Sequence, residues 1–190
     1  MQSPLSWIAT EEYLLMEQTA DVRHEYVAGQ IYAMAGASEA HNLIVTNLVA
    51  LLRPHIRGSS CRVFSSDMKV KIQTASSKSD FFYYPDLLVT CDPQDDEPYF
   101  KTKPTLIVEV LSESTKTTDR REKRANYQQI PSLQEYILIS QDKINIEIYR
   151  RDDDGNWTMK VVSFNNQPLQ LNSLGLSLTT AEIYEDVAIA

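Results

Sequence analysis

The chain has 190 residues, enough for one domain of ordinary size with its own hydrophobic core, and we expect residues 1–190 to form a single domain. Hydrophobic residues make up 43% of the chain and only 5 residues are glycine, a composition that excludes a disordered protein. The net charge is −8, from 18 Lys and Arg against 26 Asp and Glu, which disfavours strong non-specific binding to nucleic acid.

Membrane and secretory features are missing from the sequence pattern. Charged residues interrupt every apolar run before the roughly 18 residues of a membrane span. The N-terminal segment has no basic region followed by an apolar one, as a secretory signal would. Cys61 and Cys91 lack CxxC spacing, so we expect reduced cysteines and a soluble cytoplasmic protein.

The N-terminal third is predicted to contain a short helix, a hairpin and a longer helix, at residues 3–18, 23–36 and 39–58. Thr10 is the expected N-cap of the first helix. Ala28 and Gly29 separate two β-prone stretches and predict the hairpin turn. Ser38 is the expected N-cap of the second helix, and Gly58 its end.

The middle of the chain is predicted to form buried strands, at residues 61–72, 81–92 and 104–112, with a loop at 73–80. In the first strand Met68, Val70 and Ile72 alternate with Lys69 and Lys71, so one face is apolar and the other solvated. The other two strands are apolar along most of their length, which is typical of the centre of a sheet.

A helix and three strands follow, at residues 113–132, 135–140, 144–151 and 157–164. Thr118 or Asp119 is the expected N-cap of the helix, and Pro131 ends it. Asp154 and Gly155 predict a hairpin between the last two strands. The tail, residues 174–187, is predicted to add a short strand and a capped helical turn. The mixture of helices and strands indicates an α/β fold.

Two acidic residues interrupt the apolar strands. Glu109 stands within LIVEVL, and Asp86 stands within YYPDLLV. A buried carboxylate is costly unless it is paired, protonated or bound to a metal. If the two strands pair, both carboxylates meet in a site suited to Mg²⁺ or Mn²⁺. Such an ion would activate water and stabilise charge on a phosphodiester.

Lys123 is the expected third group of this site. Asp119, Lys123 and Tyr127 recur every four residues and therefore lie on one face of the predicted helix. Because the helix must fold back over the sheet, this face could bring Lys123 towards Glu109. Its ammonium would then stabilise developing negative charge.

The order of YPD, IVEVLS, ST…D…K…Y and EYILIS resembles the PD-(D/E)xK nuclease superfamily and, within it, the restriction-endonuclease family called Uma-two. The resemblance extends over residues 24–150. It implies a restriction-endonuclease-like mixed central sheet flanked by helices, divalent-metal hydrolysis of DNA phosphodiester bonds, and a homodimer.

By this resemblance Asp86 and Glu109 match the metal ligands. The superfamily lysine normally stands two residues after the glutamate, and that place is taken by Leu111. Lys123 matches the helix position to which the family has moved its lysine.

Glu25 and His41 match family positions near the same pocket, to which the resemblance assigns no definite chemical role.

Each site residue also has a structural interpretation. Asp86 would be a strand-end aspartate bound to backbone amides, and Glu109 one half of a buried salt bridge. Lys123 would be a solvated helix residue. His41 would cap its helix or lie at the edge of the core, and Glu25 would point outward from a hairpin.

Three functions remain open at this point. The first is a metal-dependent endonuclease that reaches DNA through a groove near the basic helix. The second is a catalytically idle binding or assembly module, to which the leucine at 111 points. The third is a metal-dependent hydrolase of a small phosphorylated substrate, which would need an enclosed pocket in place of an open groove.

Overall fold

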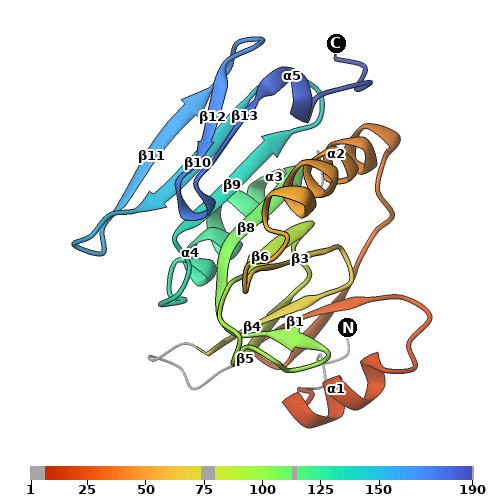
Figure 1. Ribbon diagram of the computed structural model, residues 1–190. Coiled ribbons are helices and arrows are strands. Elements are labelled where there is room, and N and C mark those ends of the chain that lie inside the picture. The colour runs from red at the N-terminus through yellow and green to blue at the C-terminus, as the bar shows by residue number, and fades with distance from the viewer. Residues whose placement is uncertain (1–6, 74–79, 113–114, 190) are drawn as a thin grey trace.

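Two β-sheets and the helices packed on them make up the protein in this computed structural model, which describes residues 7–73, 80–112 and 115–189 (Figure 1). The larger sheet has six strands, in the spatial order β11 (Trp157–Val162), β10 (Ile146–Arg151), β9 (Glu135–Ser140), β8 (Pro104–Leu111), β6 (Leu87–Thr90) and β3 (Arg62–Ser65). Strands β8 and β9 are parallel and the other neighbours are antiparallel, so this sheet is mixed, as expected.

A second sheet lies below the first in Figure 1. Its five strands are, in spatial order, β2 (Gln30–Ala33), β1 (His24–Val27), β5 (Asp80–Tyr83), β4 (Lys69–Gln73) and β7 (Phe100–Lys101). A separate antiparallel pair consists of β12 (Pro168–Leu171) and β13 (Leu176–Thr179).

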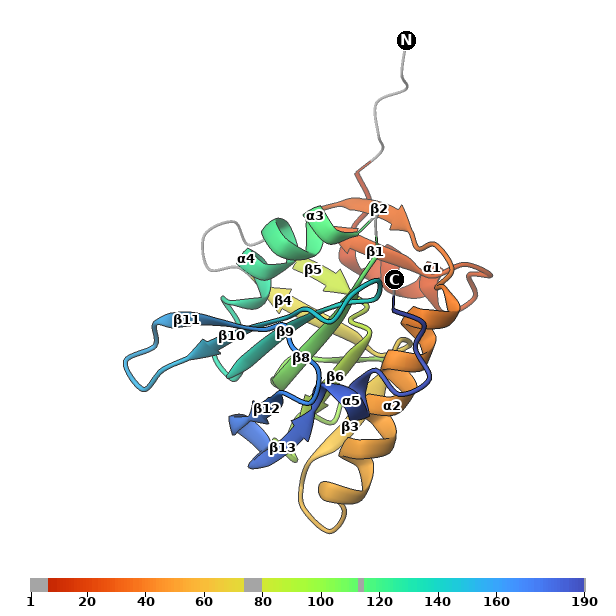
Figure 2. The same cartoon turned by 90° about the horizontal axis from the view of Figure 1, so that it is seen from above.

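Helices lie on both faces of the larger sheet, and one, α1 (Thr10–Glu17), packs on the smaller sheet through Tyr13. The others are α2 (Glu39–His55), α3 (Lys116–Thr118), the π-helical turn η1 (Asp119–Lys123), α4 (Arg124–Tyr127), the 3-10 turn η2 (Asn172–Leu174) and α5 (Thr180–Ile183). Figure 2 shows α5 beside α2, where Asn47 donates hydrogen bonds to the carbonyl oxygens of Ile183 and Glu185. No helix in the described part of the chain is long and apolar enough to cross a membrane.

The core has one layer on each side of the larger sheet. Along β8, Val108 and Val110 pack against α2 and the C-terminal strands, whereas Ile107 and Leu111 face α4 and the smaller sheet. This alternation is the one that the sequence predicts, because successive side chains of a strand point to opposite faces. Glu109 belongs to the second set and therefore points away from α2.

Two predicted strands are each divided in the structure. Residues 61–72 form β3 and β4, which belong to different sheets, and Ser66 lies between them with a left-handed φ of 54°. The apolar run at 81–92 is likewise divided into β5 and β6. Lys69 is buried and donates a hydrogen bond to the Tyr84 hydroxyl, so the predicted solvated face was wrong at that residue.

The predicted caps had mixed outcomes. Ser38 caps α2, since its Oγ accepts a hydrogen bond from the backbone N–H of His41, and the hairpin turn at Ala28 and Gly29 is confirmed. The N-cap of α1 is Ala9 and not Thr10, which is already helical. Thr118 and Asp119 cap nothing, because the helix begins earlier, at Lys116.

Two other expectations concern the loop at 73–80 and the cysteines. The loop predicted at 73–80 lies largely outside the described residues. The expectation of reduced cysteines was wrong, because Cys61 and Cys91 form a disulfide. The antiparallel register of β3 with β6, in which Arg62 faces Thr90, brings the two cysteines together although 30 residues separate them in sequence. The cytoplasmic location remains a prediction.

The N-cap of α2 leads to a prediction about stability. Ser38→Ala removes the oxygen that accepts from the His41 N–H, and we expect the free energy of unfolding to fall by about 1 kcal/mol. Ser38→Asn is the matched control, because asparagine caps helices as well as serine does. Urea denaturation measures both. An equal loss in the two variants would show that capping is not what Ser38 contributes.

Candidate active site

Asp86 and Glu109 lie opposite one another on neighbouring strands. Leu87 of β6 pairs with Val108 of β8 in an antiparallel register, which puts the preceding Asp86 beside the following Glu109. The backbone N–H of Val110 donates to Asp86 Oδ2 at 2.7 Å, and the N–H of Asp86 donates to Glu109 Oε2 at 3.3 Å. Each carboxylate is thus bound to the backbone of the strand that carries the other.

Lys123 extends from η1 into the same site. Its Nζ lies 2.8 Å from Glu25 Oε1, 3.3 Å from Glu109 Oε1 and 3.5 Å from Asp119 Oδ1. Only 8% of its side chain is exposed, so it is not a solvated helix lysine. A π-helical turn is uncommon and occurs frequently at functional sites.

Leu111 supplies no charge to the site. Its side chain is buried and belongs to the same core cluster as Tyr127 and Tyr136. Lys123 reaches Glu109 from the facing helix, as its helical spacing with Asp119 and Tyr127 predicts.

Glu25 and His41 lie at the edge of this group. Glu25 belongs to β1, where its Oε1 also accepts a hydrogen bond from the Tyr84 N–H at 3.3 Å. His41 is in the first turn of α2, and its Nε2 lies 3.0 Å from Asp86 Oδ2. The structure therefore brings together all five residues that the sequence singled out, although their chemical roles stay predictions.

Two further residues belong to the group and were not among the expected site residues. Asp119 is buried beside Lys123, and Tyr127 donates a hydrogen bond from its hydroxyl to Glu109 Oε1 at 3.0 Å. The helical spacing of both with Lys123 was the available signal. We call the seven residues together the acidic cluster, which comprises Glu25, His41, Asp86, Glu109, Asp119, Lys123 and Tyr127.

The acidic cluster holds four carboxylates and one ammonium. Burial raises the pKa of Glu109 well above its usual range; Lys123 opposes this rise and the other carboxylates add to it. Burial also raises the pKa of Asp119. Burial alone would lower the pKa of Lys123, but Glu109 and the neighbouring carboxylates raise it well above its ordinary value. Lys123 is therefore charged, and the acidic groups around it outnumber it.

The donor set of the cluster fits a hard divalent cation. His41 and Val110 both bind Oδ2 of Asp86, and Lys123 and Tyr127 both bind Oε1 of Glu109, so the second oxygen of each carboxylate is less engaged. Mg²⁺ takes one or two carboxylates and fills its other positions with water and substrate phosphate. Within the described ranges no group of three or more His, Cys, Asp or Glu side chains is placed so that it could hold a metal ion.

The members of the cluster differ in their exposure to solvent. The side chains of Asp86, Glu25 and His41 are 18%, 15% and 13% exposed. Those of Glu109 and Asp119 are only 4% and 2% exposed. Asp86 is therefore more accessible than Glu109 to an ion or ligand from solvent.

The chain is similar to a protein-family model and to two proteins of Synechocystis. The model of the Uma2 family, described as "Putative restriction endonuclease", matches residues 10–181. Over 98% of its length the chain is 38% identical to the uncharacterized protein slr1290 of Synechocystis, of which it covers 96%. It is 33% identical to sll1609 of the same organism, with coverage of 87% of this chain and 93% of that protein.

The fold also matches a crystal structure, that of a "putative nuclease belonging to DUF820" from Anabaena variabilis. The TM-score is 0.77 at 17% identity, with coverage of 95% of this chain and 99% of that one. The fold is thus that of the restriction-endonuclease-like proteins. By the match to its family model, the chain belongs to the Uma2 family.

The buried ion pairs lead to a second prediction. Lys123→Met leaves several buried carboxylates without their cation, and we expect the free energy of unfolding to fall by about 3–5 kcal/mol at neutral pH. Adding Glu25→Gln to that variant removes one uncompensated charge, so part of the loss should be recovered.

Urea denaturation of the parent, both single variants and the double variant measures this coupling. Lys103→Met is the control, since Lys103 is 41% exposed and pairs with Asp92 outside the cluster. A double variant that is less stable than Lys123→Met alone would contradict the charge imbalance described above.

Proposed function

We propose that this protein is a divalent-metal-dependent endonuclease that hydrolyses phosphodiester bonds of DNA. One observation supports it above all: Asp86 and Glu109 meet in a site where three carboxylates surround a single buried ammonium and a fourth, Asp86, pairs with His41. A divalent cation would compensate the excess negative charge. The names of the family and of the Anabaena protein support the same class of activity.

In this proposal Asp86 and Glu109 hold Mg²⁺ or Mn²⁺. When bound, such an ion lowers the pKa of water and stabilises charge on a phosphoryl group. His41 holds Asp86 through Oδ2 and so fixes the orientation of that carboxylate. Tyr127 does the same for Glu109 through Oε1.

Lys123 is the positively charged side chain that the protein contributes to the proposed active site. Its contacts with Glu25 and Asp119 fix the position of the ammonium beside Glu109. From there it can stabilise the negative charge that develops on a phosphate held above Asp86 and Glu109. Glu25 and Asp119 act as positioning residues, because they reach the phosphate only through Lys123.

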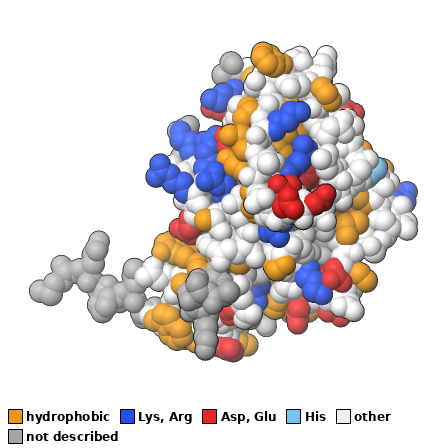
Figure 3. Space-filling view, turned by 90° about the vertical axis from the view of Figure 1, so that its left-hand side faces the viewer, with side chains coloured by type: hydrophobic (Ala, Val, Ile, Leu, Met, Phe, Trp, Pro, Cys, Tyr) orange, Lys and Arg blue, Asp and Glu red, His pale blue; other side chains and the backbone are white. Residues whose placement is uncertain are grey.

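A DNA substrate must be reconciled with the net charge of −8. Basic residues are concentrated locally, and Figure 3 shows Lys and Arg side chains gathered at the left of the face that it displays. The helix that carries Lys123 also carries Lys116, Arg120, Arg121 and Arg124, each exposed or half-buried. Such a local basic surface can bind phosphates although the whole chain is acidic. The homodimer expected from the resemblance would enlarge it and remains a proposal.

Plasmid nicking tests the proposal. Parent protein, Asp86→Ala, Lys123→Ala and the exposed-turn control Asp153→Ala are incubated with supercoiled DNA and Mg²⁺ or Mn²⁺. We expect the parent and the control to nick the plasmid, and both site variants to be slower by on the order of 10²-fold or more. A chelator should stop the reaction.

Each other outcome has a defined meaning. Equal nicking by all four proteins would identify a contaminating nuclease and remove the support for the proposal. Absence of nicking with every metal would favour the idle binding module. Hydrolysis of small phosphate esters but not of DNA would favour the third function.

A further inference from the structure

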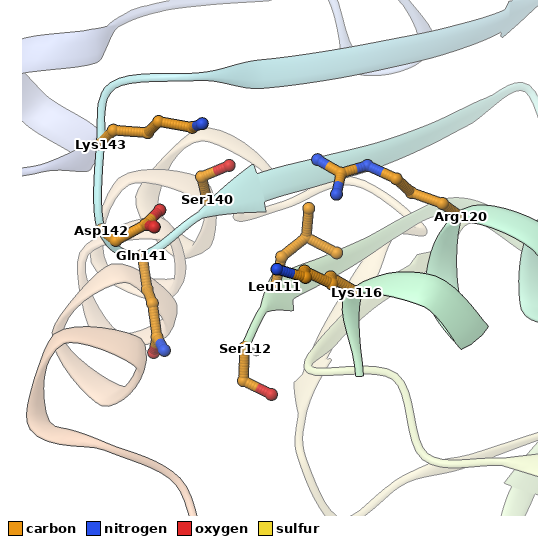
Figure 4. A pocket seen from close by; sticks show the side chains of 8 residues that line it. All are labelled: Leu111, Ser112, Lys116, Arg120, Ser140, Gln141, Asp142 and Lys143. Atoms are coloured by element: carbon orange, nitrogen blue, oxygen red, sulfur yellow. The ribbon is translucent and has the colours of Figure 1, made fainter. Parts of the chain in front are cut away.

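A pocket lies beside the acidic cluster, at the carboxyl ends of the parallel strands β8 and β9 (Figure 4). Eight residues line it: Leu111, Ser112, Lys116, Arg120, Ser140, Gln141, Asp142 and Lys143. None of them belongs to the acidic cluster, and only Lys116 and Arg120 belong to the basic surface described above.

The chemistry of the lining is that of an anion site. Lys116, Arg120 and Lys143 contribute three cationic groups, against the single carboxylate of Asp142. Figure 4 shows Lys143 and Arg120 extending towards each other from opposite sides, with the Ser140 hydroxyl between them. Ammonium, guanidinium and hydroxyl groups are the side-chain donors that bind phosphate oxygens.

The cationic groups of Arg120 and Lys143 are only partly engaged by other residues of the protein. Arg120 donates from Nε and Nη2 to Glu147 Oε1, at 2.9 and 2.7 Å, which leaves its Nη1 outside that pair. Lys143 is exposed, and within the described part of the chain its ammonium forms no salt bridge with a carboxylate. Lys143 is thus the cation of the pocket that an incoming anion can engage at the lowest cost.

Three elements connect the pocket to the acidic cluster. On β8, Leu111 lies two residues beyond Glu109, a step of roughly 7 Å. On the helix, Arg120 precedes Lys123 by three residues, which is about one turn. On α2, Ser38 donates a hydrogen bond to Gln141 of the pocket at 2.6 Å, and His41 of the cluster is in the same first turn.

We infer that this pocket binds a phosphate group of the DNA backbone next to the phosphate held at Asp86 and Glu109. This inference rests on the proposed function. The pocket would be a second point at which the protein contacts the DNA backbone. Neighbouring phosphates of a strand are one nucleotide apart, and the pocket begins two residues beyond Glu109 on β8, so one strand is proposed to present neighbouring phosphates to both. Two fixed phosphates would set the register of the strand relative to the cluster.

The experiment measures DNA binding by fluorescence anisotropy as a function of salt, with Ca²⁺ in place of Mg²⁺ to limit cleavage. Lys143→Ala removes the accessible cation. Lys103→Ala is the matched control, since it removes the same charge at the other end of β8. The slope of log K against log salt should become shallower by about 0.9 in Lys143→Ala and stay unchanged in Lys103→Ala. Between 50 and 200 mM salt, that change corresponds to a roughly 3-fold smaller loss of affinity than in the parent.

Methylphosphonate substitution then locates the contact. Each phosphate near the cleavage position is neutralised in turn, and the parent should lose affinity at a phosphate adjacent to the cleaved one. In Lys143→Ala, neutralising that phosphate should cause no further loss of affinity. Neutralising the other phosphates should still lower the affinity as it does in the parent. Identical slopes and identical substitution profiles for the parent and Lys143→Ala would overturn the inference, even if the plasmid is nicked.

The remaining outcomes separate this inference from the proposed function. A shallower slope for Lys143→Ala in a protein that nicks no DNA supports the pocket as a backbone phosphate site and contradicts the endonuclease. A further experiment measures the binding of inorganic phosphate to the parent and to Lys143→Ala. If Lys143→Ala weakens binding of inorganic phosphate but leaves DNA binding unchanged, the ligand is a free phosphate and the assignment to DNA is overturned.

Discussion

The buried ammonium of Lys123 joins three parts of the protein in one group of ion pairs. Its partners Glu25, Glu109 and Asp119 come from β1 of the smaller sheet, β8 of the larger sheet and the helix that covers it. Glu109 in turn accepts a hydrogen bond from the backbone N–H of Asp86, which immediately precedes β6. The relative positions of the two sheets and the helix are therefore tied to one cluster of charges, and the site depends on all of them.

This cluster is poorly explained as a device for stability alone. A buried ion pair gains little over well-packed hydrophobic residues of similar volume, because each charge loses its hydration. Here the carboxylates outnumber the ammonium as well, and burial raises the pKa of both Glu109 and Asp119. Strongly perturbed groups gathered in one place are characteristic of functional sites, where the missing charge comes from a metal or substrate. The idle-module alternative would require the same costly arrangement without that compensation.

Much of the fold and of the site could be predicted from sequence because the signals are local. A charge inside an apolar strand identified Asp86 and Glu109, and a spacing of four identified the helix face of Lys123. Each of these signals depends only on the periodicity of a single element. The parallel pairing of β8 with β9 then follows from the helix that connects them.

Other features depend on contacts that no local pattern contains. The division of residues 61–72 between two sheets results from a left-handed residue, Ser66, in a stretch that alternates like one strand. Lys69 appears on a solvated face in the sequence, yet the smaller sheet buries it beside Tyr84. The disulfide depends on the register of two strands that are distant in sequence. The capping role expected of Asp119 gave way to its role as a partner of Lys123.

The proposed endonuclease requires Asp86 and Glu109 to bind one divalent cation between them. A crystal structure of the protein grown with Mn²⁺, with anomalous scattering recorded at the manganese edge, would locate that cation. We expect one anomalous peak about 2.1 Å from an oxygen of each carboxylate, with Lys123 still beside Glu109. A peak elsewhere, or carboxylates that keep only their contacts to His41, Lys123 and Tyr127 at saturating Mn²⁺, would contradict it.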